Sequence, residues 1–160
     1  MRLLTAYFSA EGTTAGMAKI LAEAVGSDIF EIKPEDPYTA ADLKWTNPMA
    51  RCNREKIGKK DVHVTGTVEG FEQYDTVLLG FPIWYYSAPN VVGTFCRQYN
   101  WEGKKLILFA TSGGSDIGKT AEKLGPSVKG ADILGAKVFK DPSELTAWAR
   151  SLLDAAKPRQ

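Results

Sequence analysis

Apolar residues gather along the chain in short runs separated by polar, glycine-containing segments, which predicts strands alternating with helices. The five runs expected to form strands are residues 3–8, 29–32, 76–81, 105–110 and 136–139. The run at 3–8 is almost continuously apolar, as in a central parallel strand covered on both faces. After it, Met17, Leu21 and Val25 recur at helical spacing, and Gly26 can end that helix.

Two later helices are predicted from their first residues and their apolar faces. Pro89 suits the first turn of a helix whose apolar face continues to Tyr99. Asp141 followed by Pro142 and Glu144 is typical of a helix start with a capping box. The apolar positions that follow Glu144 predict that this last helix packs inward.

Residues 33–70 give a weaker pattern, because prolines at positions 34, 37 and 48 interrupt regular structure. Short helices are expected there, with a ragged strand near residues 62–68. The chain has neither an internal repeat nor a low-complexity tract, and 160 residues is the length of about one domain. Residues 1–160 are therefore expected to form a single domain.

Strands that alternate with helices favour an α/β fold, a doubly wound parallel sheet with helices on both faces. Such sheets bind ligands beyond the carboxyl ends of their strands, near the point where the strand order reverses. The loops after the first, third and fourth predicted strands emerge at that edge. Because these three loops are the most glycine-rich, polar or aromatic in the chain, we expect the functional site there.

The first loop joins a strand to a helix and has the chemistry of a phosphate-binding loop. Free N–H groups and the positive end of the helix dipole attract an anion, and a glycine allows a tight turn. Neither a lysine-containing P-loop nor a multi-glycine dinucleotide motif is present. An ordinary threonine-rich helix cap is the alternative. The loop consists of Ser9, Ala10, Glu11, Gly12, Thr13 and Thr14.

The second and third loops indicate a flat ligand beside that anion. Aromatic side chains at the carboxyl end of a strand have little core to fill, so stacking on a planar ring suits them. Packing on a neighbouring helix is the alternative for the aromatic loop, and an ordinary strand-to-helix turn is the alternative for the glycine loop. The two loops consist of Pro82, Ile83, Trp84, Tyr85 and Tyr86, and of Thr111, Ser112, Gly113, Gly114 and Ser115.

Together the three loops describe a site with a phosphate at one end and a planar ring at the other, which a mononucleotide such as FMN fits. The chain also resembles the flavodoxin family over almost its whole length. The most specific segments are Pro82–Trp84 and Thr111–Ser115, and Ser9–Thr14 resembles the family's phosphate signature. The resemblance implies a five-stranded parallel sheet in the order 2-1-3-4-5, with noncovalent FMN held by the three loops.

The resemblance further implies low-potential electron transfer between redox proteins. On this interpretation the chain is an electron carrier more than a stand-alone enzyme, and it has no catalytic residue of its own. Because no insertion interrupts the fifth predicted strand, the chain resembles the short-chain group. An FMN-dependent NAD(P)H:quinone-type oxidoreductase is the alternative, and a flavin-free binding module on the same fold is a third possibility.

Three departures from the family pattern affect this interpretation. Glu11 stands where a threonine or serine is usual, and a carboxylate beside a phosphate is unfavourable unless it faces water. Gly113–Ser115 stands where classical flavodoxins often have a tyrosine, which predicts a more open ring face. Classical electron-carrier flavodoxins are strongly acidic, whereas this chain has a formal net charge of +1. Local clusters such as Glu69, Glu72 and Asp75 could still attract a partner.

The composition of the chain limits which partners and which cellular compartment are expected. With 20 Lys+Arg and 19 Asp+Glu, the formal net charge is +1, which gives no reason to expect nucleic acid or an anionic membrane. No apolar run is long enough to span a membrane. Cys52 and Cys96 lie far apart, as in a cytoplasmic protein with reduced thiols. The single histidine, His63, has no second ligand at metal spacing, so no metal site is expected.

Overall fold

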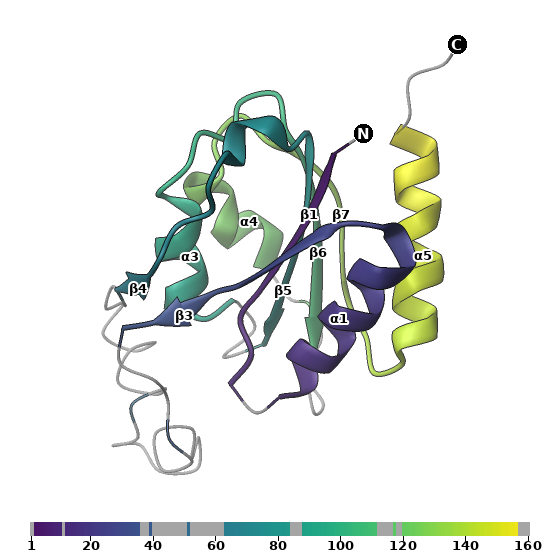
Figure 1. The fold of residues 1–160 in the computed structure, drawn as a ribbon, viewed down its shortest axis with the longest axis horizontal. Helices are drawn as coiled ribbons and strands as arrows, with labels where there is room; N and C mark the ends of the chain where they lie inside the picture. Colours follow the sequence, from purple (N-terminus) through teal and green to yellow (C-terminus); the bar gives the residue numbers. More distant parts are fainter. Residues whose placement is uncertain are drawn as a thin grey trace.

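Five parallel strands form the central sheet of the computed structural model (Figure 1). The structure describes residues 2–10, 12–35, 39, 51, 63–83, 88–111, 117 and 120–156. The sheet has the order β2-β1-β5-β6-β7, which confirms the predicted 2-1-3-4-5 arrangement. Its strands are β1 (Leu3–Tyr7), β2 (Asp28–Glu31), β5 (Thr76–Pro82), β6 (Lys105–Thr111) and β7 (Asp132–Val138).

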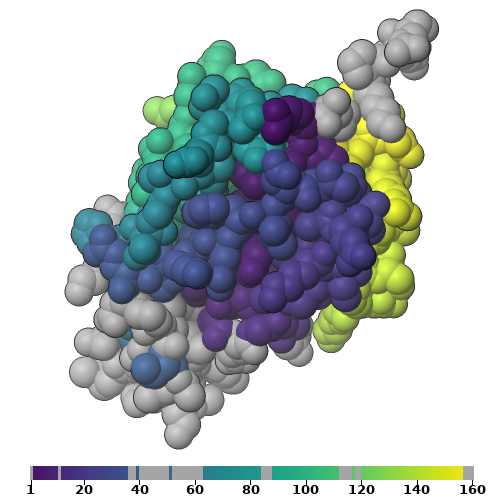
Figure 2. All heavy atoms as spheres, viewed as in Figure 1, coloured from purple at the N-terminus to yellow at the C-terminus, as the bar shows by residue number. Residues whose placement is uncertain are grey.

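Helices cover both faces of this sheet. The helices α1 (Thr13–Val25) and α5 (Pro142–Ala156) lie on one face, and α3 (Asn90–Cys96) and α4 (Thr120–Leu124) lie on the other. Figure 2 shows α1 and α5 meeting along one side of the molecule. There the Arg150 side chain donates a hydrogen bond of 2.9 Å to the Ala24 carbonyl.

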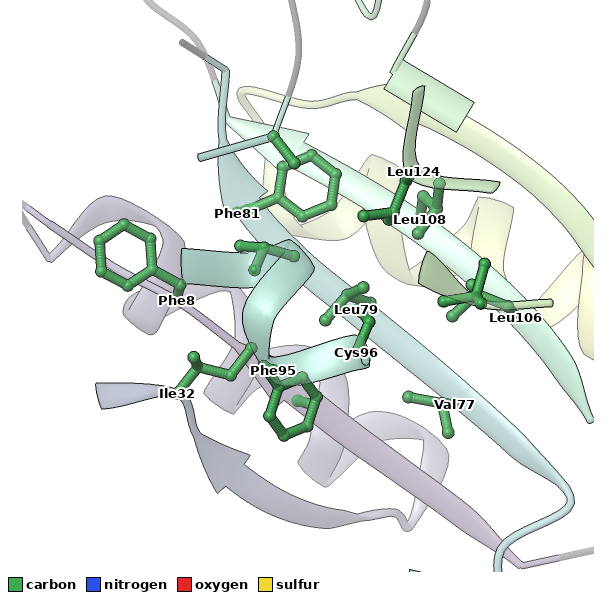
Figure 3. Packing of buried hydrophobic residues seen from close by; sticks show 14 of the residues in the cluster. Phe8, Ile32, Val77, Leu79, Phe81, Phe95, Cys96, Leu106, Leu108 and Leu124 are labelled. Carbon is green, nitrogen blue, oxygen red and sulfur yellow. The ribbon is translucent and has the colours of Figure 1, made fainter. Parts of the chain in front are cut away.

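The buried strands explain why their sequences show no apolar–polar alternation. On β5, Val77, Leu79 and Phe81 point toward α3, whereas Leu78 points toward α1 and α5. Figure 3 shows the core between the sheet and α3, with Phe95 of α3 against the sheet. Both faces of the strand are therefore apolar because each has its own helical layer.

The last strand is longer than its apolar pattern predicted. β7 begins at Asp132 rather than at residue 136, because Gly135 interrupts the apolar run without interrupting the strand. A Cβ atom at Gly135 would lie 2.9 Å from side-chain atoms of both Trp148 and Leu152, so the α5 side chains occupy that space. The strand runs over seven residues without an insertion, as expected for the short-chain group, although its pairing with β6 shifts in register between Leu106 and Ile107.

Two further expectations concern helix ends. Asp141 caps α5 through a 2.9 Å hydrogen bond from the Ser143 N–H to its carboxylate, but within the described residues Glu144 makes no reciprocal capping-box bond. The helix α3 ends at Cys96, earlier than its apolar face predicted. Tyr99 follows in a turn and still packs inward, with its ring centroid 4.3 Å from that of Phe71.

The weakly predicted middle of the chain is partly described. The ragged strand expected near residues 62–68 is present as β4 (Val64–Thr65), which pairs antiparallel with β3 (Lys33–Pro34) in a separate two-stranded ribbon. The short helices expected between them fall almost wholly outside the described residues. Two 3-10 helices, η1 (Phe71–Gln73) and η2 (Gly125–Ser127), complete the described elements. No helix in the described ranges is long and apolar enough to cross a membrane.

Candidate cofactor site

The strand order brings three loops to one edge of the sheet. β1 pairs with β5, and β5 with β6, so the carboxyl ends of these three strands are neighbours at the bottom of Figure 1. Tyr7 is paired with Gly80, and Pro82 with Thr111. The chain leaves β1 toward β2 on one side and β5 toward β6 on the other, so the strand order reverses between β1 and β5. This is the position at which doubly wound sheets bind ligands.

The first loop turns the chain tightly from β1 into α1. Gly12 has a φ of +95°, and its N–H donates a 3.0 Å hydrogen bond to the Ser9 hydroxyl. A Cβ atom at Gly12 would meet nothing within 4 Å, so the position requires glycine for its backbone angle rather than for space. The turn closes with a 3.1 Å bond from the Gly16 N–H to the Gly12 carbonyl.

The first turn of α1 keeps hydrogen-bond donors available. The N–H groups of Thr13 and Thr14 have no hydrogen-bond partner in the described part of the chain, as expected for a helix N-terminus without a side-chain cap. No acidic side chain lies in that first turn. Two free N–H groups and the positive end of a 13-residue helix dipole make this loop suitable for an anion.

The threonine hydroxyls of this loop have different surroundings. Thr13 is exposed, whereas Thr14 is only 2% exposed. The Thr14 hydroxyl lies 2.7 Å from the hydroxyl of Thr111, the last residue of β6, which is 5% exposed. A buried hydrogen bond therefore joins the first loop to the start of the third.

The end of β5 is tied to the same threonine. The Ile83 N–H donates a 2.9 Å hydrogen bond to the Thr111 carbonyl. The Ile83 side chain is half-buried and packs against the core, as does that of Ala10 in the first loop. Pro82 is also half-buried. The structure thus brings together the described members of all three predicted loops.

The remaining predicted site residues lie outside the described part of the chain. They are Glu11, Trp84, Tyr85, Tyr86, Ser112, Gly113, Gly114 and Ser115. Their roles therefore stay predictions from the sequence.

Comparisons with known proteins agree with this geometry. A model of the flavodoxin family matches residues 2–152. The chain belongs to the flavodoxin family. Comparison with curated proteins finds no significant match.

Solved structures of flavoproteins resemble the chain closely. A protein from Bacteroides eggerthii, assigned as a flavoprotein, is 37% identical with a TM-score of 0.87, covering 98% of this chain and 99% of that one. A similarly assigned protein from Bacteroides uniformis is 35% identical with a TM-score of 0.83, covering 93% and 97%. A flavoprotein from Lactobacillus acidophilus in complex with FMN shares the fold at 24% identity and a TM-score of 0.69, covering 92% and 98%.

Among the described residues, few ionisable groups lie at this edge of the flavodoxin fold. Tyr7 ends β1, and its burial, with a smaller effect of the Glu31 carboxylate, raises the pKa of its phenol. The phenol is therefore neutral at physiological pH. Glu69, Glu72 and Asp75 lie just before β5, at the opposite edge of the sheet. A partner attracted by that cluster would dock away from the three loops.

Sequence reasoning missed the pairing of Thr14 with Thr111. Both were predicted to contact the cofactor, but each was assigned to a separate loop. The one available signal was weak: Thr111 is the only hydroxyl-bearing residue in the otherwise apolar segment 106–111.

Proposed function

We propose that this member of the flavodoxin family binds FMN noncovalently at the carboxyl edge of its sheet and carries electrons between redox proteins. The observation that carries the proposal is the open N-terminus of α1, which follows β1 directly at the point where the strand order reverses. That position in a doubly wound sheet binds the phosphate of a nucleotide.

The donors at this edge fit a phosphate monoester. The N–H groups of Thr13 and Thr14 are unpaired in the described ranges, and the Ser9 hydroxyl accepts from Gly12 while keeping its own proton for donation. These groups are neutral, so the attraction for a dianion comes from oriented N–H groups and the helix dipole rather than from a salt bridge. In our proposal Ser9–Thr14 hold the phosphate.

The aromatic and glycine loops suit the ring end. We propose that Pro82–Tyr86 and Thr111–Ser115 frame the flavin ring, with Trp84 or Tyr85 stacked on it or against its edge. Bound FMN supplies one- or two-electron chemistry, while the protein supplies position and electrostatics. The FMN complex of the Lactobacillus acidophilus flavoprotein, which shares this fold, supports the choice of cofactor.

Titration of FMN with the protein tests the cofactor proposal. We expect flavin fluorescence to be quenched with a stoichiometry of about one. Gly12→Ala places a non-glycine residue at a φ of +95°, which costs about 1–2 kcal/mol. We expect the free variant to relieve this strain by relaxing the turn, so that FMN binding has to restore the turn and affinity falls about tenfold. Gly16→Ala is the matched control, because a Cβ atom there also meets nothing within 4 Å and the position lies within the helix.

A failure of the wild-type protein to quench FMN at any accessible concentration would overturn the cofactor proposal and favour a flavin-free module. Equal affinities of the Gly12→Ala and Gly16→Ala variants would show that the turn into α1 has no part in binding.

The near-neutral net charge of +1 favours a second candidate, an FMN-dependent NAD(P)H:quinone-type oxidoreductase. A small organic acceptor does not need the acidic docking surface that is typical of classical carriers. Anaerobic reduction of the FMN-loaded protein distinguishes the two candidates. Two separated one-electron steps with negligible NAD(P)H turnover support the carrier, whereas rapid reduction by NAD(P)H alone supports the enzyme.

A further inference from the structure

Thr111 is the first residue of the third loop and makes a hydrogen bond with each of the other two. Its carbonyl accepts the 2.9 Å hydrogen bond from the Ile83 N–H, where the second loop begins. Its hydroxyl lies 2.7 Å from that of Thr14, in the first turn of α1. The chain then continues from Thr111 into the third loop. One residue at the end of β6 is thus placed to affect all three loops together.

Within the described residues, the hydroxyl pair has one proton more than it has acceptors. Two threonine hydroxyls carry two protons, and the bond between them uses one. A helical threonine often donates to the carbonyl four residues earlier, but no such bond from Thr14 to the Ala10 carbonyl is present. In the described part of the chain, neither hydroxyl has a further acceptor.

Burial makes that spare proton significant. Thr14 is 2% exposed and Thr111 is 5% exposed, so water has little access to either side chain. A buried hydroxyl proton without an acceptor is unfavourable. Thr14 lies in the first turn of α1, where an anion would also accept from the N–H groups of Thr13 and Thr14, which have no partner in the described ranges.

We propose that Thr111 is a positioning residue of the phosphate subsite, whose hydroxyl holds the Thr14 hydroxyl so that the spare proton of the pair is donated to the FMN phosphate. The proposal rests on the proposed function, since it assumes that FMN binds at this edge. It adds a residue from β6, distant in sequence, to a phosphate site that the sequence assigns to the first loop alone.

The decisive test compares FMN with riboflavin, which lacks the phosphate. Thr111→Val keeps the shape of the side chain and removes the hydroxyl. We expect the dissociation constant for FMN to rise about tenfold, while that for riboflavin changes less than threefold. Thr111→Ser keeps the hydroxyl and should retain the wild-type ratio of the two constants. Equal losses for both ligands, or no loss for either, would refute the proposal, because a merely structural role does not distinguish them.

A double-mutant cycle tests whether the two threonines act as one unit. Thr14→Val should lower FMN affinity, and adding Thr111→Val to it should lower the affinity little further. The double variant leaves no buried hydroxyl of the pair unpartnered, so its ratio of FMN to riboflavin affinity can still be measured if a single variant does not fold. An unchanged ratio in the double variant would refute the proposal. Fully additive losses would contradict the shared-proton account.

Inorganic phosphate gives a readout without flavin. It should raise the melting temperature of the wild-type protein and have a smaller effect on Thr111→Val; an equal effect on both would oppose the proposal. Thr5→Val is the matched control, because Thr5 is a fully buried strand threonine whose hydroxyl lies 2.6 Å from that of Ser27, away from the three loops. If the wild-type protein binds neither FMN nor phosphate, the proposed function fails. If the wild-type protein binds both, and Thr111→Val binds both with the same affinities, only this inference fails.

Discussion

The two edges of the sheet differ in how they use hydrogen-bonding groups. At the amino-terminal edge, the buried Lys104 ammonium donates to the carbonyls of Phe71, at 3.2 Å, and of Tyr74. The Asp75 carboxylate accepts from the Arg2 N–H at 2.8 Å. These side chains satisfy main-chain groups at the strand starts and leave little for a ligand.

The carboxyl edge shows the opposite behaviour. The N–H groups of Thr13 and Thr14 and one proton of the Thr14–Thr111 pair have no partner in the described ranges. An uncapped helix N-terminus leaves N–H groups open in any fold, whereas a buried hydroxyl proton usually has an acceptor. The difference between the two edges supports our proposal that the carboxyl edge binds an anionic ligand, whereas the amino-terminal edge serves stability.

The largest expected effect is at the amino-terminal edge. Lys104→Met removes the donor to at least two carbonyls and the cation located 4.9 Å from the Phe71 ring centroid. We expect the free energy of unfolding to fall by about 2–4 kcal/mol, measured by denaturant titration. If the edges differ as described, FMN affinity should stay within about twofold of wild type under conditions where the variant is folded.

The second largest effect is expected in the sheet interior, between the two edges. A Cβ atom at Gly80 would lie 2.3 Å from atoms of the buried Phe109 ring. Gly80→Ala should therefore destabilise the protein by about 1–3 kcal/mol through overpacking. The control is Phe109→Leu in the same background, which should recover part of the loss by removing ring atoms. A neutral Gly80→Ala substitution would mean that the ring can move freely.

A smaller and pH-dependent effect is expected at Tyr74. Its phenol donates a 2.6 Å hydrogen bond to the Asp28 carboxylate, and this bond, followed by burial, raises the pKa of Tyr74. Because the folded-state pKa is raised, the stabilisation is present below pH 10 and is lost as pH rises through the folded-state pKa.

Tyr74→Phe should thus lower the free energy of unfolding by about 1 kcal/mol at pH 7. The difference from wild type should hold up to about pH 9 and shrink above pH 10. If urea titrations show that the difference in unfolding free energy between wild type and Tyr74→Phe grows as the pH rises, the pKa of Tyr74 is not raised by folding.

The smallest effect separates two glycines of the carboxyl edge. Gly16 is exposed inside α1, and alanine is a better helix former, so Gly16→Ala should stabilise the protein by about 0.5–1 kcal/mol. Gly12→Ala should not, because the φ of +95° at that position suits glycine. Thermal denaturation of the two variants measures this contrast. Equal stabilisation by both substitutions would show that Gly12 and Gly16 do not differ in their need for glycine.

The apolar pattern predicted the central strands well because they are buried on both faces, whereas the order of the sheet was implied by the resemblance to the flavodoxin family. Continuous apolar runs such as 106–110 can be recognised without knowledge of the fold, and the chain alternates them with helices. β7 was harder, since Gly135 breaks the apolar run and its role depends on Trp148 and Leu152 of a later helix. The apolar face also does not reveal that α3 ends at Cys96, because Tyr99 packs inward from beyond the helix, against Phe71.

The sequence predicts that three loops meet at one edge of the sheet, and their described members do meet there, but it does not predict the bond that joins two of them. Local composition identified Ser9–Thr14 as a suitable anion loop, because glycine and hydroxyl residues follow a buried strand. The bond between Thr14 and Thr111 spans 97 positions in sequence, and no local pattern encodes it. Only the strand order, which places β6 beside β5 and near α1, brings the two hydroxyls together.

The central claim is that the carboxyl edge binds the phosphate of a flavin nucleotide, and the most direct test compares two ligands on the unmodified protein. The dissociation constants of FMN and riboflavin should be measured by fluorescence quenching under identical conditions. We predict that FMN binds at least about a hundredfold more tightly, since at least two charge-assisted hydrogen bonds, each worth about 1.5–3 kcal/mol, depend on the phosphate. Equal affinities for the two ligands would contradict the account.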